Sequence, residues 1–248
     1  MNIISIINQK GGVAKTTTSI NVAAAWAKLG KKILLIDLDP QSSATKAIFG
    51  EKEFDDTIYD VLINRLPPEK AVLHSPQFGI DVIPSEILLS GVDIQIAANF
   101  GREKLLKQKL DSIRKKYDTV LIDCPPSLGL LTINALMASK DIIIPICPEY
   151  FSIKGIELIL DTLKNIRVGL DHKIDVRGIV ITRYKDRKIT NSIIQQIKMT
   201  YGLKIYEDFI PDNIVVEEAH HKHLPVGKYA PQSKASKAYE SLSKELWG

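Results

Sequence analysis

The chain has 248 residues, of which 45% are apolar and 25% charged, and it contains only two cysteines. This composition is that of an ordinary soluble globular protein, and it excludes the disordered, collagen-like and disulfide-scaffold classes. No apolar run reaches the about 20 residues that a membrane-spanning helix needs. The N-terminus also lacks the basic and apolar regions of a signal peptide. We therefore expect a cytoplasmic protein in which Cys124 and Cys147 stay reduced.

The net charge of +4 is unevenly distributed along the chain. Residues 1–176 carry 21 lysines and arginines against 21 acidic residues, whereas residues 177–248 carry 12 against 8. The whole basic excess thus lies in the last third. Such an excess permits binding to nucleic acid or to an acidic membrane without requiring either. From charge alone, a solvated lysine-rich surface remains the simpler interpretation.

Short apolar runs alternate with amphipathic stretches from end to end. The apolar runs predict strands at 3–7, 33–37, 80–83, 119–123, 142–146, 176–182 and 205–210. The amphipathic stretches predict helices at 15–29, 102–116, 127–139, 152–167, 188–201 and 233–246. Strands rich in Ile, Val and Leu without polar alternation favour a sheet that is buried on both faces. We expect one α/β domain over residues 1–248, with a mostly parallel, twisted sheet and helices on both faces.

The segment at 8–18, NQKGGVAKTTT, follows the first strand and runs into the first helix. A glycine-rich turn at a helix N-terminus directs several backbone N–H groups at one point, where the helix dipole also favours an anion. Lys15 can then reach the β- and γ-phosphates of a nucleotide, and the Thr16 hydroxyl can bind Mg²⁺. This arrangement predicts a P-loop NTPase.

The loop departs from the usual pattern G-x-x-x-x-G-K-[ST], because Gln9 and Ala14 stand at its glycine positions. It resembles the deviant Walker A box, K-G-G-x-G-K-[ST]-[ST], with Ala14 in place of the third glycine. A positive φ at Ala14 would cost about 1 kcal/mol or more. A helical φ at the start of the following helix would make the alanine harmless. The sequence leaves both possibilities open.

Acidic residues end two of the predicted apolar strands. Asp37 and Asp39 close the strand at 33–37, and Asp123 closes the strand at 119–123, before a Pro-Pro turn. Ligands of open α/β sheets gather at the carboxyl ends of the strands. We therefore expect these acids to converge on the phosphates and Mg²⁺.

These motifs, taken together and in this order, resemble the ParA/MinD class of deviant Walker A ATPases and, within it, the ParA/Soj partition proteins. The similarity extends over nearly the whole chain. It includes the segments 8–18, 34–45, 121–136 and 148–155, with a weaker match from 211–214 to 229–231.

The resemblance implies ATP and Mg²⁺ as ligands and a slow ATPase that dimerises with ATP between its subunits. It makes Lys15 the Walker A lysine and Lys10 the signature lysine that reaches the partner subunit's nucleotide. Asp39 is expected to position the attacking water. Asp37 either supports the Mg²⁺ region or acts on that water, and Asp123 binds Mg²⁺ through a water. The turn after Asp123 is expected to move with the γ-phosphate.

The resemblance also implies the remaining contacts to the nucleotide. The phosphates are expected to contact Lys10, Gly11, Gly12, Val13, Ala14, Lys15, Thr16 and Thr17, with Thr16, Asp37 and Asp123 near the metal. The adenine is expected near Thr182, Arg183, Pro211 and Asn213. Glu149 matches a family position near the dimer interface, although an ordinary surface acid is an equally simple interpretation.

Basic residues of the last third are candidates for contact with the phosphates of non-specific double-stranded DNA. They are Lys185, Arg187, Lys188, Lys222, Lys228, Lys234 and Lys237, of which family similarity favours Arg187 most. The segment 211–215 departs from the family pattern, because Asp212 and Val215 stand where Soj-like members carry arginines. Either neighbouring lysines compensate, or the protein acts on another surface.

Our leading hypothesis is a partition switch for plasmid or chromosomal DNA, associated with the nucleoid and stimulated by a ParB-like centromere-binding partner. The alternative is a MinD-like ATPase acting on a membrane or a protein assembly. The weak apolar stripe of the segment 233–248 favours docking against the core over stable membrane association. A redox or metal-insertion ATPase would need an exposed cysteine pair, which Cys124 and Cys147 do not offer. A binding module without hydrolysis would be insensitive to loss of Asp39.

Overall fold

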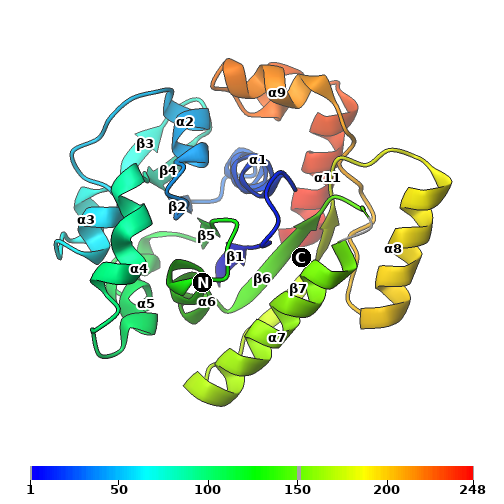
Figure 1. Cartoon of the computed structure of the whole chain (residues 1–248). Coiled ribbons are helices and arrows are strands. Elements are labelled where there is room, and N and C mark those ends of the chain that lie inside the picture. Colours follow the sequence, from blue (N-terminus) through cyan, green and yellow to red (C-terminus); the bar gives the residue numbers. More distant parts are fainter. Residues whose placement is uncertain (1, 150–151, 248) are drawn as a thin grey trace.

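The computed structural model describes residues 2–149 and 152–247. Tyr150 and Phe151, within the matched segment 148–155, lie outside the described residues. The described strands form one seven-stranded sheet in the order β3-β4-β2-β5-β1-β6-β7 (Figure 1). Their bounds are β1 Asn2–Ile6, β2 Ile33–Asp37, β3 Leu73–Ser75, β4 Ile80–Ile83, β5 Thr119–Asp123, β6 Asp141–Ile146 and β7 Asp175–Ile181.

The sheet is parallel except at one edge, where β3 runs antiparallel to β4. The first strand lies in the middle, between β5 and β6. The loop that follows β1 therefore emerges at the point where the strand order diverges to the two sides, which is where ligands bind in such sheets. In the β2–β5 ladder Asp37 is paired with Asp123, so that the two acids end neighbouring strands side by side.

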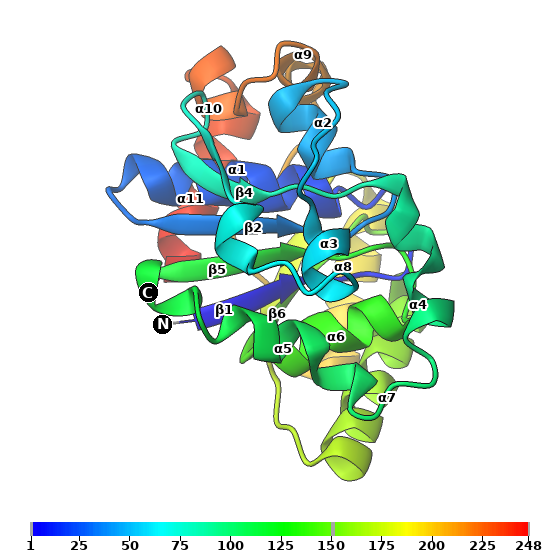
Figure 2. The ribbon, with the colours of Figure 1, turned by 90° about the vertical axis from the view of Figure 1, so that its left-hand side faces the viewer.

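Helices cover both faces of the sheet (Figure 2). Alternate residues of β2 point to opposite faces, with Leu34 and Ile36 in one apolar core and Leu35 in the other. One face packs mainly against α1 and α11, and the other against α5, α6 and α7. The helices are α1 Lys15–Lys28, α2 Ser43–Phe49, α3 Ile58–Leu62, α4 Val92–Gln95, α5 Leu105–Leu110, α6 Leu130–Ala138, α7 Ser152–Leu170, α8 Lys188–Tyr201, α9 Ile214–His221, α10 Val226–Tyr229 and α11 Lys234–Trp247. The predicted α/β class with a mostly parallel sheet is confirmed.

The single helix predicted at 102–116 is wrong. The chain instead forms a 3-10 turn at Arg102–Lys104, the short helix α5, and a second 3-10 turn at Arg114–Lys116. The side chain of Asn134 explains the first break. Its Oδ1 accepts from the Leu106 N–H at 3.1 Å, and its Nδ2 donates to the Arg102 carbonyl at 2.7 Å. Asn134 thus takes the place of the backbone hydrogen bond that would join these residues in a continuous α-helix.

The strand predicted at 205–210 is also wrong. Only isolated bridges form here, between Ile179 and Ile205 and between Tyr184 and Pro211. The chain touches the β7 edge at both ends of the segment and bends away between them. The acidic pair at 207–208 lies at this bend, and such residues are unfavourable in strands.

Several short elements escaped the search for periodic patterns, namely β3, α2, α3, α4, α9 and α10. Two of them carried recognisable local signals. Pro76 and Gly79, with φ 69° at the glycine, make the turn of the β3–β4 hairpin. Thr57 and Asp60 form a capping box at the start of α3.

The last helix is docked on the first. The apolar side chains of α11 enter the same core as Trp26, and Leu242 and Leu246 are fully buried. Trp26 donates its Nε1–H to the Ser243 carbonyl at 2.8 Å, and its ring stands edge-on to that of Trp247 at 5.2 Å. The expectation that the 233–248 segment packs against the core is met. No helix among the described residues is long and apolar enough to span a bilayer.

Truncation of Leu242 to alanine should lower the free energy of unfolding by about 2–5 kcal/mol, because it removes a buried side chain and leaves a cavity between α11 and α1. Urea denaturation measures this. The matched control Lys244→Ala, on the exposed side of the same helix, should change the free energy by less than about 0.5 kcal/mol. Equal effects of the two substitutions would contradict the docking of α11.

Candidate functional site

The loop between β1 and α1 is braced from neighbouring strands. Asn8 donates its Nδ2–H to the Pro145 carbonyl of β6 at 2.8 Å, and its Oδ1 accepts from the Lys10 N–H at 2.9 Å. The hydroxyl of Thr182, at the end of β7, donates to the Val13 carbonyl at 3.0 Å. The loop therefore holds its shape through the side chains of Asn8 and Thr182 and a backbone carbonyl of β6.

Ala14 adopts a left-handed conformation, with φ 61° and ψ 34°, at the N-cap of α1. Its carbonyl accepts the first hydrogen bond of the helix, from the Thr18 N–H at 2.9 Å. Of the two possibilities that the sequence left open, the structure has the one in which alanine is strained. The strain lies in the loop that would bind phosphate, where costly backbone conformations are often concentrated.

Lys15 is almost entirely buried, and its Nζ donates to the Lys10 carbonyl at 3.2 Å. Burial lowers the pKa of this lysine, and the negative charges of Asp123 and Asp39 act in the opposite direction. A lysine held in this way, beneath a ring of backbone N–H groups, is placed to bind an anion seated on the loop.

Asp123 lies directly beneath the start of α1 and is fully buried. Its Oδ2 accepts from the Thr16 hydroxyl at 2.7 Å, and its Oδ1 accepts from the Ser19 hydroxyl at 2.8 Å. Sequence reasoning missed Ser19, although it stands one helical turn after Thr16 and so on the same face of α1. The structure brings the predicted Mg²⁺ ligands Thr16 and Asp123 into direct contact.

Asp37 is also fully buried, but its carboxylate faces the chain that follows it. Its Oδ2 accepts from both the backbone N–H and the hydroxyl of Thr45, at 2.8 and 2.7 Å, and its Oδ1 accepts from the Asp39 N–H at 3.2 Å. The Thr45 hydroxyl in turn accepts from the Ser85 N–H at 2.9 Å. Asp37 therefore fixes the course of residues 37–45, and any direct contact to a metal would require these bonds to open.

Asp39 lies at the mouth of the site and is 8% exposed. Its Oδ1 accepts from the Gln41 N–H at 2.9 Å, and its carbonyl accepts from the Ser85 hydroxyl at 2.7 Å. Its Oδ2 has no hydrogen-bond partner among the described residues. Of Asp37 and Asp39, only Asp39 therefore keeps a carboxylate oxygen without a partner among the described residues. No local sequence pattern pointed to Ser85, which comes from the end of β4.

The donor set suits Mg²⁺, a hard cation that prefers hydroxyl, carboxylate, water and phosphate oxygens. Burial raises the pKa of Asp123, and the charge of Asp37 raises it further. Burial likewise raises the pKa of Asp37, against the hydrogen bonds from Thr45. Two buried acids with raised pKa values mark a place that lacks positive charge, and a divalent cation would supply it. The described residues contain no cluster of three or more His, Cys, Asp or Glu side chains able to hold a metal.

Lys10 points away from its own loop and forms an ion pair with Glu149, both side chains being well exposed. This contact, together with a hydrogen bond from the Cys147 thiol, lowers the pKa of Glu149. The ammonium group of Lys10 is therefore directed away from its own phosphate cradle, and among the described residues its ion-pair partner is Glu149, in a weak surface contact.

The four residues predicted near the adenine lie together at the end of β7, beside the loop. Arg183 has a left-handed φ of 49°, and its Nη1 lies 3.5 Å from the Gly12 carbonyl. Pro211 is bridged to Tyr184, and Asn213 caps α9 by accepting from the Val215 N–H at 3.1 Å. Contact of these residues with adenine stays a prediction.

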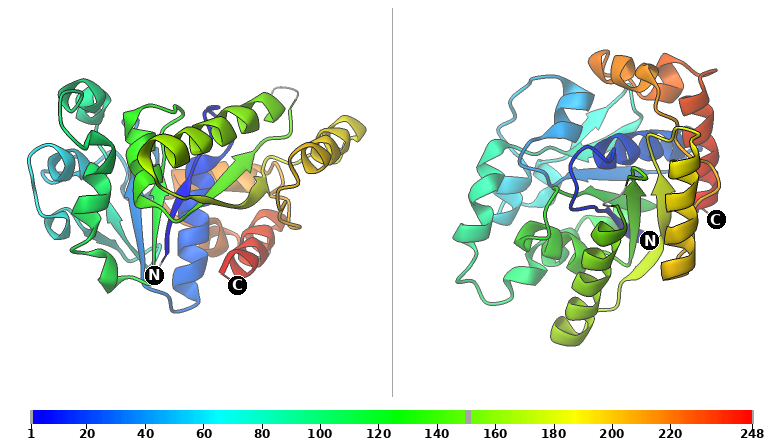
Figure 3. Two further views of the ribbon diagram at one scale, coloured as in Figure 1. Left: turned by 90° about the horizontal axis from the view of Figure 1, so that it is seen from below. Right: turned by 45° about the vertical axis from the view of Figure 1, so that its right-hand side comes forward.

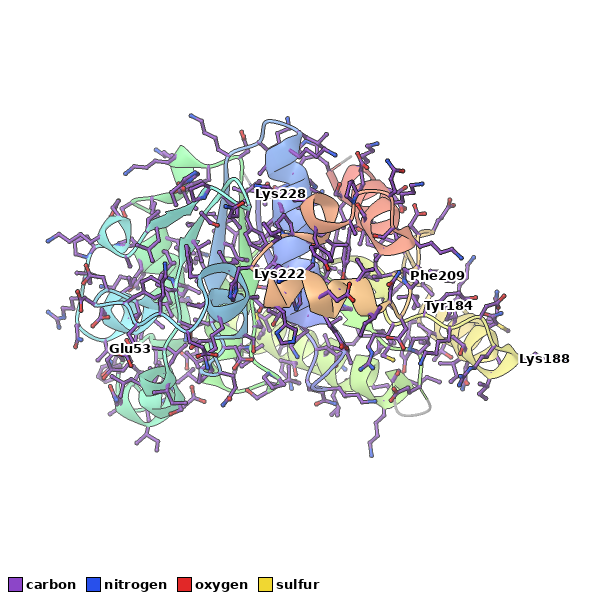
Figure 4. All side chains as sticks on the ribbon, turned by 90° about the horizontal axis from the view of Figure 1, so that it is seen from above. Glu53, Tyr184, Lys188, Phe209, Lys222 and Lys228 are labelled. Carbon is purple, nitrogen blue, oxygen red and sulfur yellow. The ribbon has the colours of Figure 1, made fainter. Side chains whose placement is uncertain are left out.

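The predicted DNA contacts do not form a single patch. Lys185, Arg187 and Lys188 lie at the β7–α8 connection, whereas the others lie on or beside α9, α10 and α11. Figure 4 shows Lys188 at one end of the molecule, well separated from Lys222 and Lys228. Two lysines are already engaged, since Lys185 is paired with Asp212 and Lys228 donates to Gln77 at 2.6 Å. Among the described residues, no ion pair holds Arg187, Lys188, Lys222, Lys234 or Lys237.

A family model described as an AAA domain matches residues 1–176. Over 246 residues the chain is 37% identical to the sporulation initiation inhibitor protein Soj of Bacillus subtilis, covering 98% of this chain and 97% of that protein. The chain belongs to the ParA/Soj family. It is also 36% identical, over 250 residues, to the chromosome partitioning protein ParA of Caulobacter vibrioides, covering 99% of this chain and 94% of that one.

Similarity in three dimensions agrees with this assignment. The crystal structure of cobyrinic acid a,c-diamide synthase from Mycobacterium smegmatis, with bound ADP and magnesium, superposes with a TM-score of 0.88 at 29% identity. It covers 99% of this chain and 94% of the other. The ParA/Soj family resemblance seen in the motifs is thus confirmed, together with the P-loop ATPase fold.

Replacing Ala14 by glycine should raise the free energy of unfolding by about 1 kcal/mol, because glycine adopts φ 61° without the strain on the alanine Cβ. Urea denaturation without nucleotide measures it. The control Ala25→Gly, at a helical position of α1, should lower the free energy by about 1 kcal/mol. A loss of stability in Ala14→Gly would contradict the strained conformation.

The stability of the nucleotide-free protein should fall as the pH rises from the ordinary carboxyl range. A carboxyl whose pKa is raised in the folded state binds its proton more tightly there than in the unfolded chain, and that advantage is lost as it ionises. Between about pH 5 and pH 8, Asp123→Asn should reduce this fall by at least about 1 kcal/mol. Denaturation curves at each pH test this, with Asp161→Asn on the exposed side of α7 as control. An unchanged pH dependence in Asp123→Asn would contradict the raised pKa.

Proposed function

We propose that this chain is an ATP-dependent dimerising switch for the partition of plasmid or chromosomal DNA. In its ATP-bound form it binds double-stranded DNA without regard to sequence, and a ParB-like centromere-binding partner stimulates slow hydrolysis and release. The observation that carries the proposal is the convergence of Lys15, Thr16, Asp39 and Asp123 at the loop after β1. Membership of the ParA/Soj family supports it, as do relatives named for chromosome partitioning.

ATP with Mg²⁺ is the ligand that this site fits. The loop from Lys10 to Thr17 offers backbone N–H groups for the β- and γ-phosphates, and Lys15 adds a positive charge beneath them. The Thr16 hydroxyl would hold the cation directly, and Asp123 would hold it through a water. The hydrogen bond that Thr16 now donates to Asp123 would then break. The cation neutralises charge that develops on the phosphates during transfer.

Asp39 would orient the attacking water, and Asp37 would act through it as a positioning residue. The carboxylate of Asp39 has one oxygen without a hydrogen-bond partner among the described residues, whereas the oxygens of Asp37 are engaged with Thr45 and the Asp39 backbone. This difference in hydrogen bonding supports the positioning role for Asp37 over direct support of the Mg²⁺ region. Water oriented by a single positioned carboxylate is consistent with slow turnover.

Lys10 would complete the site of a partner subunit. Its ammonium group already points away from its own loop, and only the exposed ion pair to Glu149 has to break for it to reach across an interface. A cation supplied in this way stabilises transition-state charge only in the dimer. ATP binding and dimerisation would thereby depend on each other, in a dimer of two-fold symmetry.

DNA contact would begin at Arg187, which is exposed at the start of α8 next to the strand that ends at the nucleotide loop. Lys188 and the lysines of the α9–α11 region would extend the contact. The alternative of a membrane-acting ATPase has less support, because the apolar side of α11 is buried against α1.

Asp39→Ala should lower the ATP turnover rate by about 10²-fold or more while ATP still binds, since the variant loses the group that orients water. Single-turnover hydrolysis and nucleotide titration separate the two steps.

In the Asp39→Ala variant, binding to a random-sequence DNA duplex should require ATP rather than ADP. Arg187→Ala should reduce the salt slope of log K by about 1. The control Arg167→Ala, which removes an exposed arginine from α7, should leave the slope unchanged. Dimerisation with ATP but no DNA binding would overturn the partition function.

A further inference from the structure

A cavity of about 340 Å³ lies next to the nucleotide site, between the ends of β6 and β7 and the start of α8. Its wall carries three cations at alternate positions of one segment, Arg183, Lys185 and Arg187. Two carboxylates, Glu149 and Asp212, also line it. Figure 3 shows that α8 stands at the outer end of the molecule, beyond the β7 edge of the sheet. Arg187, which forms no ion pair among the described residues, is one of the residues that line the cavity.

Asp212 is directed at two of these cations. Its Oδ2 lies 2.6 Å from Nζ of Lys185, and its Oδ1 lies 3.6 Å from Nε of Arg183. The lysine holds the pKa of this carboxyl below its ordinary value, so the group is ionised at neutral pH. Each carboxylate oxygen therefore occupies a position that an oxygen of an external anion would take.

The first turn of α8 supplies further donors to the same cavity. Arg187 is the N-cap residue and makes no side-chain capping hydrogen bond. Thr190, one turn into the helix, lines the cavity and is only 7% exposed. A helix N-terminus beside three cations is suited to an anion with several acceptor oxygens.

The carboxylate is held in place by the backbone. The Tyr184 N–H donates to the Ile210 carbonyl at 2.9 Å, and the Asp212 N–H donates to the Tyr184 carbonyl at 3.2 Å. These two hydrogen bonds join the β7–α8 connection to the segment before α9, and they hold Asp212 opposite Lys185. Arg183 also approaches the nucleotide loop, through Gly12. The cavity is therefore linked on one side to the predicted nucleotide site.

We propose that this cavity binds one phosphate of a nucleic-acid backbone, and that Asp212 fills it as an internal competitor until that phosphate displaces the carboxylate. The inference rests on the proposed function, and it assigns a role to the acid that departs from the family pattern. A phosphodiester carries the same single negative charge as the carboxylate and two exposed oxygens for Lys185 and Arg183. Because binding must break an existing ion pair, Asp212 keeps the affinity for DNA low and easily reversed.

The decisive variant is Asp212→Asn, which removes the competing charge and keeps the shape of the side chain. In the Asp39→Ala background with ATP and Mg²⁺, it should bind a random-sequence duplex about three- to tenfold more tightly at roughly 0.1 M salt. Its salt slope should be steeper by about 1, since one more phosphate is neutralised. Adding Arg187→Ala should remove most of this gain. Asp212→Ser serves as a second variant with the same expected sign.

The matched control is Glu217→Gln, which removes one negative charge from the neighbouring helix α9 without releasing a cation of the cavity. Equal gains in affinity for the duplex from Asp212→Asn and Glu217→Gln would show that the effect comes from net charge alone, and this would overturn the proposal. An unchanged affinity in Asp212→Asn, with the parent protein binding DNA, would overturn the competitor while leaving the proposed function intact. A loss of all DNA binding in every variant, with ATP-dependent dimerisation preserved, would instead overturn both.

A titration with inorganic phosphate distinguishes the two sources of a phosphate group. We expect inorganic phosphate, monitored by NMR with the nucleotide site saturated, to shift the resonances of the 183–190 segment only weakly. The cavity would be assigned to a free anion if inorganic phosphate bound at least as tightly, per site, as the DNA duplex and if Asp212→Asn strengthened that binding. That result would contradict the nucleic-acid assignment.

Discussion

Two carboxylates buried side by side at the carboxyl end of the sheet constrain the rest of the structure. Asp37 and Asp123 end neighbouring strands at paired register positions, with no exposed surface. Burying a charged group is costly unless hydrogen bonds or an opposite charge compensate. The compensation present comes from hydroxyls and backbone N–H groups of residues 16, 19, 39 and 45. These donors are supplied by α1, by the start of α2 and by the loop between them and the strands.

This compensation is incomplete, and its incompleteness links folding to ligand binding. Hydroxyl donors satisfy the oxygens of Asp123 but leave its charge, which burial and the nearby Asp37 make unfavourable. Lys15 is the nearest cation, and it too is destabilised by burial. Binding of a divalent cation together with phosphates would therefore stabilise this site. The cation would bring positive charge to Asp123, and the phosphates would bring negative charge to Lys15.

The surroundings of the nucleotide loop show how the site communicates with the surface. Asn8 ties the loop to a backbone carbonyl of β6, Thr182 ties it to the end of β7, and Arg183 extends from the same end of β7 towards Gly12. The next residues along the chain line the cavity that Asp212 closes. The predicted nucleotide site and the proposed anion site therefore share one short segment, with Arg183 adjoining both. A change in the position of that segment would be felt in both places without any long pathway.

The amino-acid sequence by itself determined the strands of the parallel sheet, the nucleotide loop and the acids at the ends of β2 and β5. These features rest on short-range patterns, because a buried strand, a glycine-rich turn and a helix start each leave a local signature. It did not determine the left-handed φ of Ala14, the break at Leu106 or the irregular course of 205–210. Only the tertiary structure decided these, since each depends on partners distant in sequence, as Asn134 does for Leu106. The pairing of Asp212 with Lys185 is of the same kind, because two loops 27 residues apart meet only when β7 is in place.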